Sequence, residues 1–345
     1  MKILVVRFRQ IGDAILASVV CKSLKETFPD AQIDYVLYEN ISPLFEKQDY
    51  LNEVITISER ERKNIFKYIK KAWRVTRKEY DVVIDIMSTP KSEVFTLFSR
   101  KAKYRIGRWK PKRGFTYTHS IPEPSSEYDK AEKFLKMLDP LIQDGIDVKL
   151  NSSYSLKFLN EEINDLKCKM VKAGVDFNKI VIPLAINSRR ERKVYPVDLM
   201  KELTKKILAE FNCQIILYYS PQEKEFAKKF HEDLNWDNRI ISNIETKSIR
   251  ELGALICNCD IFIGNEGGPR HLAQGVGIPS FSIFSPSSNK RDWLSKNNVY
   301  HEGIEPRDIK CDNYEKLSYE EKYRLITPDI ILEKVREKMK LIKKK

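Results

Sequence analysis

The sequence is poor in glycine and has no long apolar run. Its 345 residues include 12 glycines, about half of the usual ~7% share. No run of apolar residues approaches the roughly 18 needed for a membrane span, so none is predicted. The first residues, 1–7, reach an arginine after four apolar residues, and we therefore expect no secretion signal.

The sequence also lacks the spacings typical of metal and nucleophile sites. Its six cysteines show no Cys-x-x-Cys spacing and no nearby histidine, so we expect reduced thiols in the cytoplasm. No Asp-x-Asp pair follows a predicted strand, and we expect no metal site for a sugar diphosphate. No Ser/His/Asp order or Cys/His pair indicates a nucleophilic enzyme.

Positive charge, by contrast, is abundant. The formal net charge is +13 and the isoelectric point is about 9.2. Such a balance favours an acidic partner, which can be nucleic acid, an anionic membrane, or a phosphorylated or carboxylated glycan. A solvated, lysine-rich surface is the alternative explanation.

Short apolar segments alternate with segments of helical spacing. In the first half we predict strands at 3–6, 33–37, 54–57 and 81–86, and helices at 11–28 and 62–80. In the second half we predict strands at 180–186, 214–219, 239–241, 261–263 and 281–284, and helices at 197–211, 223–234, 248–257 and 329–342. Short apolar strands with helical crossovers indicate parallel sheets covered on both faces.

The alternation lapses between the halves. Seven Lys and Arg residues gather with aromatic residues over 101–117, and helices are predicted at 126–138 and 160–173. We therefore predict an α/β protein of two tandem Rossmann-like domains, 1–160 and 175–345, with 160–173 as a linker helix. Ligands of such folds bind beyond the carboxyl ends of the strands, so two facing domains predict an inter-domain cleft.

A glycine-rich turn is the most informative segment. Five of the twelve glycines fall within 264–277, after a strand and before a helix with Pro269 at its predicted first position. Gly267 and Gly268 remove side chains just before the helix, so backbone N–H groups and the positive end of the helix dipole can meet an anion closely. We predict a phosphate site here, beside Glu266 and His271. A lone histidine on a helix can also be purely structural.

Asp13 follows the first predicted strand. Gly12 permits a tight turn into the helix, which puts Asp13 at the helix start. Aspartate is a favoured N-cap, so capping alone can explain it. The helix dipole lowers the basicity of the carboxylate, yet an ionised carboxylate can still accept a proton from an attacking hydroxyl. Neither Gly-x-x-x-x-Gly-Lys nor Gly-x-Gly-x-x-Gly occurs here.

Two further polar segments follow strands of the second half. The strand 180–186 opens into Asn187-Ser-Arg-Arg-Glu-Arg-Lys-Val-Tyr-Pro196, whose hydroxyl and cations suit a diphosphate. A solvated basic loop would look the same. Ser220-Pro-Gln-Glu223 follows the next strand, and the carboxylate of Glu223 can accept both hydroxyls of a ribose or cap the next helix.

Together these segments resemble glycosyltransferase family 9, the ADP-heptose:lipopolysaccharide heptosyltransferases. The likeness covers most of the chain and rests on four segments in order: Ile3 to Leu16, Arg189 to Pro196, Gly264 to Pro286, and Ile326 to Asp329. The resemblance implies a GT-B fold and an inverting, metal-independent transfer without a cofactor. The donor would be ADP-heptose, and the acceptor an anionic lipopolysaccharide inner core.

The resemblance also implies roles for individual residues. Asp13 matches the catalytic base, and Lys193 with Ser188 matches the groups on the donor diphosphate. Glu223 matches the ribose-binding carboxylate. The phosphate-facing turn is matched by Gly267, Gly268 and His271. Glu266, at the donor sugar, stands where the family usually has aspartate, which leaves the identity of the donor sugar open.

The basic cluster is assigned to the acceptor, and it departs from the family pattern. Its members are Arg105, Arg108, Lys110, Lys112 and Arg113. The family commonly has a histidine before a Glu-Arg pair, whereas this chain reads Tyr128-Asp-Lys-Ala-Glu-Lys133. The basic C-terminal residues are expected either to contact the inner face of an anionic cytoplasmic membrane or to form a solvated helix: Lys334, Arg336, Lys338, Lys340 and 343–345.

Three other functions fit parts of the same pattern. A glycosyltransferase of this fold can use another nucleotide-sugar to build a capsule or other surface glycan. The aromatic-basic segment around Trp109 suits nucleic acid, but no recognised binding motif is present and we expect no nucleic-acid partner. A nucleotide-binding protein without catalysis is the third, and the presence of Asp13 and Lys193 argues against it.

Overall fold

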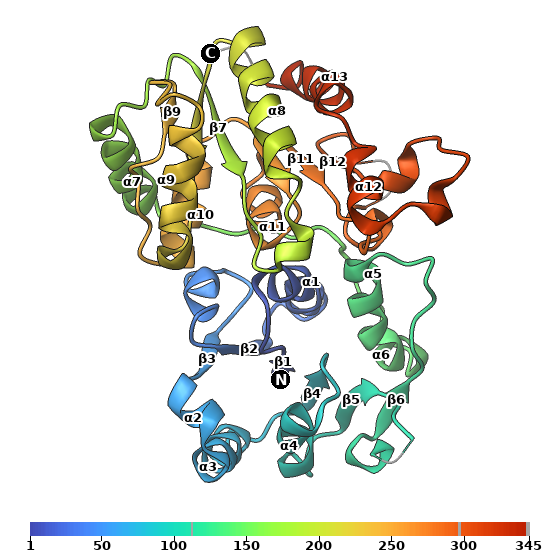
Figure 1. Ribbon diagram of the computed structural model, residues 1–345. Helices are drawn as coiled ribbons and strands as arrows, with labels where there is room; N and C mark the ends of the chain where they lie inside the picture. Colours follow the sequence, from blue (N-terminus) through green and yellow to red (C-terminus); the bar gives the residue numbers. More distant parts are fainter. Residues whose placement is uncertain (112, 296–297, 343–345) are drawn as a thin grey trace. The chain divides into compact units, whose positions relative to one another are not determined.

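The computed structural model describes residues 1–111, 113–295 and 298–342 (Figure 1). Lys112 of the predicted acceptor cluster lies outside these residues. Contacts divide the chain into two compact units, Met1–Lys157 and Phe158–Lys345, and each unit is described by itself. The predicted linker helix is part of the second unit, because α7 (Asn160–Lys172) packs on α10 (Ile249–Cys257).

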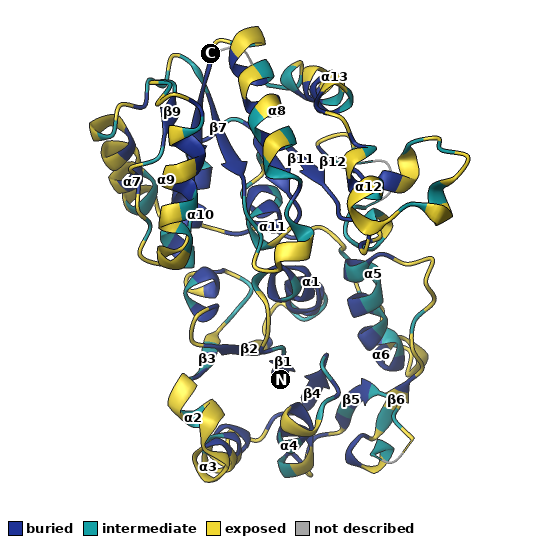
Figure 2. Cartoon of the chain, in the orientation of Figure 1, coloured by how far each residue is buried: buried dark blue, intermediate teal, exposed yellow. Residues whose placement is uncertain are grey.

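The first unit is built on a parallel sheet with the strand order β3-β2-β1-β4-β5-β6. Its strands are β1 (Lys2–Val6), β2 (Gln32–Tyr38), β3 (Glu53–Ile57), β4 (Val82–Asp85), β5 (Tyr104–Arg108) and β6 (His119–Ile121). The strands β1, β2 and β4 are buried almost throughout (Figure 2), as expected for a sheet covered on both faces. Sequence reasoning missed β5 and β6, which lie in the segment where the pattern lapses.

The helices of the first unit cover this sheet. They are α1 (Ile11–Thr27), α2 (Glu59–Lys63), α3 (Ile65–Thr76), α4 (Pro90–Phe98), α5 (Lys130–Leu135) and α6 (Asp139–Gln143). Leu4 and Val6 of β1 pack in one core with Tyr68 of α3 and Phe95 of α4. The basic helix predicted over 62–80 is present as α3, but its bounds are narrower: Asn64 is extended between α2 and α3, its side chain caps α3, and the helix ends at Thr76.

The second unit has a parallel sheet with the strand order β12-β11-β10-β7-β8-β9. Its strands are β7 (Ile180–Ala185), β8 (Cys213–Leu217), β9 (Ile240–Ile241), β10 (Phe262–Asn265), β11 (Ser280–Ile283) and β12 (His301–Ile304). Besides α7 and α10, its helices are α8 (Val197–Glu210), α9 (Lys224–Glu232), α11 (Gly268–Gly275), α12 (Tyr319–Arg324) and α13 (Pro328–Met339). The prediction that β11 is the last strand is wrong, because β12 pairs with its outer edge.

Each sheet contains a topological switch point. The chain builds the first sheet outward from β1 in one direction and from β4 in the other, and the second sheet likewise from β7 and β10. Ligands of open α/β sheets bind beyond the carboxyl ends of such strand pairs. The predicted α/β class with two parallel-sheet units is therefore confirmed. In the part of the chain that the structure describes, no helix has the length and apolarity to cross a bilayer.

Candidate active site

An ion pair lies at the switch point of the second sheet, called the second switch point, beyond the carboxyl ends of the adjacent strands β7 and β10. Lys193 lies in a short 3₁₀ turn after β7, and Glu266 directly follows β10. The Nζ atom of Lys193 donates to Oε2 of Glu266 at 2.7 Å and to Oγ of Ser288 at 2.9 Å. Glu266 is only 6% exposed, so the paired ammonium group compensates a carboxylate that has left water.

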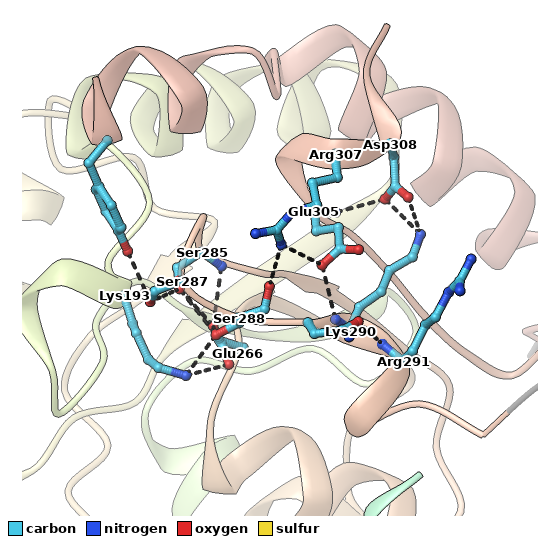
Figure 3. A network of polar contacts seen from close by, with 12 residues as sticks. Lys193, Glu266, Ser285, Ser287, Ser288, Lys290, Arg291, Glu305, Arg307 and Asp308 are labelled. Atoms are coloured by element: carbon cyan, nitrogen blue, oxygen red, sulfur yellow. Dashed lines mark hydrogen bonds and ion pairs between the residues drawn. The ribbon is translucent and has the colours of Figure 1, made fainter. Parts of the chain in front are cut away.

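A serine loop after β11 holds the other oxygen of Glu266 (Figure 3). Oε1 accepts from the backbone N–H of Ser285 at 3.2 Å and from its hydroxyl at 3.1 Å, and also from the Ser288 hydroxyl. Arg307 donates to the carbonyl of Ser288 at 3.2 Å and fixes the loop from the far side. Sequence reasoning gave no site role to Ser288. The run Ser285-Pro-Ser-Ser288, directly after a buried strand at the switch point, is the signal that could have found it.

The glycine turn directly follows Glu266 in the sequence. Gly267 is extended, with φ 166°, and α11 begins at Gly268, with Pro269 one position later than predicted. A Cβ at Gly267 would meet nothing closer than Pro269 at 3.7 Å, so packing alone does not require glycine there. Gly264 differs, because its φ is +125° and a Cβ would lie 2.5 Å from the carbonyl oxygen of Ala185 in β7. The close approach of β10 to β7 therefore requires that glycine.

His271 is buried inside the first turns of α11. Arg270 donates to its Nδ1 at 2.8 Å, and the ring of Trp293 lies 5.7 Å away, centroid to centroid. Burial, followed by the charge of Arg270, holds the pKa of His271 well below its ordinary value. The ring is therefore neutral, and any phosphate contact would use a neutral N–H rather than an imidazolium.

Ser188 and Glu223 belong to one hydrogen-bonded chain beyond β7 and β8. The backbone N–H of Ser188 donates to Oδ1 of Asn187 at 2.8 Å, and Nδ2 of Asn187 donates to Oε1 of Glu223 at 2.8 Å. The second oxygen of Glu223 accepts from the N–H and hydroxyl of Ser220 in a capping box. Glu223 thus caps the short 3₁₀ turn Pro221–Glu223, whereas the following helix α9, whose N-cap is Glu223, has no side-chain cap. The contact of Glu223 with a ribose stays a prediction.

Asp13 lies in the first turn of α1, beyond the carboxyl end of β1. Gln10 is the N-cap and makes no side-chain cap, so the interpretation of Asp13 as an N-cap is wrong. The carboxylate instead lies 3.0 Å from the guanidinium of Arg7, and both side chains are 14% exposed. Arg7 in turn lies over the ring of Phe134, 5.5 Å from its centroid. Arg7, which sequence reasoning left without a role, therefore fixes the direction of the carboxylate.

A second carboxylate, Asp85, lies at the end of β4, the strand next to β1 at the switch point of the first sheet. It is fully buried and accepts from the N–H groups of Met87 and Ser88 at 3.0 and 2.9 Å. The Tyr117 hydroxyl donates to it at 2.9 Å, and a Cβ at Gly107 would collide with the Tyr117 ring at 2.2 Å. Burial raises the pKa of Asp85 to about 6. In the sequence, Asp85 follows the apolar residues Val82 to Ile84 at the end of a strand. This position could have indicated a functional carboxylate, but sequence reasoning did not use it.

The predicted acceptor cluster is partly neutralised within the first unit. Arg108, at the end of β5, pairs with Glu123 at 2.7 Å, and Arg113 pairs with Glu93 at 3.1 Å. Arg105 lies three residues before Arg108, nearer the opposite end of the strand. Because Arg108 and Arg113 are each paired with a glutamate, the described members of the cluster carry less unpaired positive charge than their sequence indicates.

Among residues 1–111, 113–295 and 298–342, no group of three or more His, Cys, Asp or Glu side chains is arranged to hold a metal ion. All six cysteines are free thiols. The absence of a metal requirement stays a prediction.

A matching family model and a known relative both agree with the resemblance found in the sequence. The family model described as glycosyltransferase family 9 (heptosyltransferase) matches residues 69–319, which include Lys193, Glu266 and the glycine turn. The chain is 24% identical to lipopolysaccharide heptosyltransferase 1 of Campylobacter coli, over 86% of this chain and 87% of that protein.

Solved structures of similar architecture include two from E. coli. The ADP-heptose lps heptosyltransferase II has a TM-score of 0.77 at 18% identity, covering 99% of each chain. The heptosyltransferase WaaC with ADP-2-deoxy-2-fluoro heptose has a TM-score of 0.70 at 15% identity, covering 98% of this chain and 99% of that chain. These likenesses establish a GT-B fold.

Proposed function

The chain belongs to glycosyltransferase family 9, the heptosyltransferases, and from this premise we propose that it transfers heptose from ADP-heptose to an anionic lipopolysaccharide inner core. The observation that carries the proposal is the Lys193–Glu266 pair at the second switch point, beside the N-terminus of α11 in the chain. An ADP-linked donor is supported by the structurally similar E. coli WaaC, whose structure holds ADP-2-deoxy-2-fluoro heptose.

In the proposed reaction the second unit stabilises the leaving group. Negative charge grows on the diphosphate as the bond from the anomeric carbon to its oxygen breaks. Lys193 supplies a cation, Ser188 a hydroxyl, and the backbone at Gly267 and Gly268 supplies N–H donors at a helix N-terminus. These groups supply the electrostatic stabilisation that a metal ion would otherwise give, so we expect a chelator to leave turnover unchanged.

The first unit supplies the base. Asp13 takes the proton of the acceptor hydroxyl as that oxygen attacks the anomeric carbon, and Arg7 keeps the carboxylate oriented. Attack opposite the departing diphosphate inverts the anomeric configuration. We infer that the acceptor is anionic because Lys110 adds a positive charge just after β5, beside Arg108 and Arg113, which are each paired with one glutamate.

Nucleotide binding tests the donor half of the proposal. A ligand at a hundred times its dissociation constant adds about 2.7 kcal/mol to stability, which a thermal shift detects readily. We expect ADP to stabilise the protein more than UDP or GDP. A transfer assay with ADP-heptose and a lipopolysaccharide that lacks heptose then tests the reaction. Stabilisation by UDP alone, with no product from ADP-heptose, would overturn the proposal.

Glu266 favours one alternative within the same family. It is one methylene longer than the aspartate usual at this position, and both of its oxygens are already bonded. The alternative is a transferase that uses another nucleotide-sugar to build a capsule or other surface glycan. Product formation across a panel of ADP- and UDP-sugars separates the two, since the alternative requires turnover of a sugar other than heptose.

A further inference from the structure

Helix α3 of the first unit has two apolar faces, and one of them is exposed. Tyr68, Ala72 and Val75 are buried on the inner face. The outer face, called the α3 face below, is exposed by 53%, 81%, 39% and 50% at Ile65, Phe66, Ile69 and Trp73. Ile65, Ile69 and Trp73 are spaced by four residues, so they follow one side of the helix. A cluster of large apolar side chains held in water marks an interaction site.

Cations border the α3 face. The segment from Ile65 to Arg77 carries five basic residues and no acidic one: Lys67, Lys70, Lys71, Arg74 and Arg77. The guanidinium of Arg77 lies over the Trp73 ring, 5.0 Å from its centroid. A helix with Trp, Phe and Ile on one side and Lys and Arg beside them is suited to the boundary between headgroups and acyl chains.

The place of α3 in the sheet topology gives this surface a direction. The chain leaves the carboxyl end of β3, forms α2 and then α3, and returns to the start of the parallel strand β4. The first turn of α3, with Ile65 and Phe66, therefore lies toward the carboxyl side of the sheet, where Asp13 and Asp85 also lie. Figure 2 shows α2 and α3 as a largely exposed segment of their unit.

We propose that the α3 face docks on an anionic lipid bilayer, with Phe66 and Trp73 at the acyl boundary and the neighbouring cations on lipid headgroups. A second copy of this chain is a poorer occupant, because each copy carries a net charge of +13 and self-contact would bring the two basic borders together. Lipid headgroups supply the opposite charge. The docking does not depend on which sugar the enzyme transfers.

The C-terminal helix, where sequence reasoning placed the membrane contact, is less suited to it. In α13 Arg336 pairs with Glu210, and Lys338 is buried and pairs with Glu302 at 2.9 Å. Lys334 lies 3.5 Å from Glu337. These partners reduce the charge that α13 can offer to lipid, and α13 presents no exposed cluster like the α3 face among its described residues.

Vesicle co-sedimentation of the full chain tests the proposal without donor or acceptor, so its result is independent of any transfer activity. The vesicles are phosphatidylcholine alone or mixed with phosphatidylglycerol. We expect binding only to the anionic vesicles, weakening steeply as salt rises. The double variant Phe66→Ala/Trp73→Ala should bind at least about tenfold more weakly. Trp236→Ala, which removes a 52% exposed tryptophan of the second unit, is the matched control and should bind like wild type.

Three outcomes would overturn the proposal. Equal binding to neutral and anionic vesicles would mean that the cations beside the α3 face do not contribute to lipid binding. Undiminished binding by the double variant would mean that another surface contacts the lipid. A wild-type dimer in sedimentation analysis that the double variant converts to monomer would make a second copy the occupant. Thermal unfolding of each variant at the wild-type temperature shows that a loss of binding is not a loss of folding.

Discussion

Lys193 and Glu266 are 73 residues apart in sequence, yet they form a 2.7 Å ion pair beyond two adjacent parallel strands. Their side chains are 18% and 7% exposed, so neither charge is well solvated. Removing one partner of a largely buried pair leaves the other uncompensated, which typically costs about 3–5 kcal/mol. Two roles must therefore be separated by experiment: the pair stabilises the second unit, and in the proposed reaction its ammonium group contacts the donor diphosphate.

Lys193→Ala should lower kcat about 10²–10³-fold, because it removes one electrostatic donor to the leaving diphosphate. Arg190→Ala removes an exposed cation from the same loop and should change kcat little. Lys193→Arg keeps a positive charge beside Glu266, so it tests whether a correctly folded second unit is sufficient for the wild-type kcat. Steady-state kinetics with thermal unfolding of all three variants checks this. Equal kcat values for the alanine variants would contradict the role given to Lys193.

Asp13→Ala should nearly abolish transfer while nucleotide affinity, measured by calorimetry, stays at the wild-type value. The N-cap of α1 is Gln10, so loss of capping does not explain such a result. Arg7→Met is the companion variant: it leaves the carboxylate in place without its 3.0 Å partner, and we expect a smaller loss in kcat than for Asp13→Ala. Full activity of Asp13→Ala would remove the proposed base.

Two glycines, Gly264 in β10 and Gly267 before α11, should respond to alanine in opposite ways. Gly264→Ala forces a Cβ to within 3 Å of the Ala185 backbone at a positive φ, so we expect misfolding or a large fall in the melting temperature. Gly267→Ala meets no close atom, so the melting temperature should stay near wild type. If an anion approaches this turn, Gly267→Ala should instead weaken ADP binding. Unchanged ADP affinity would place the phosphate elsewhere.

The order of buried elements was predictable because their residues are apolar with clear periods. Strands β1, β2, β4, β7 and β8 are almost wholly buried, and each lies within a few residues of its predicted position. The missed strands β5, β6 and β12 contain arginine, histidine or glutamate. Their β-structure comes from pairing with a neighbouring strand, a contact that local hydrophobic patterning does not record.

The candidate site was predictable by residue type but not by partner. The positions of Lys193 and Glu266 after strands were visible in the sequence, whereas their mutual pairing depends on β7 and β10 being neighbours across the switch point. The Arg7 contact of Asp13 and the burial of His271 likewise arise from packing between segments. Sequence periodicity constrains such contacts only through the fold.

The buried carboxyl of Asp85 should make the stability of the first unit fall as pH rises from about 4 to about 6. Its pKa rises from 3.8 to about 6 on folding, so over this interval the folded protein holds a proton that the unfolded chain has released. Integrated over the interval, this difference is worth about 3 kcal/mol. Other carboxylates have the opposite sign, for example Asp198, whose pKa is lowered by Arg324, so the effect must be isolated by difference.

Asp85→Asn provides that difference, because asparagine does not titrate in this range. Hydrogen exchange of peptides that cover β4 (Val82–Asp85) reports the opening free energy of the first unit, and variant and wild type are compared at the same pH so that intrinsic exchange rates cancel. The opening free energy of wild type minus that of the variant should fall by about 3 kcal/mol between pH 4 and pH 6 and then level off. A difference that is flat across this interval would mean that Asp85 is ionised throughout and that its burial is compensated by Tyr117 and the backbone N–H groups of Met87 and Ser88.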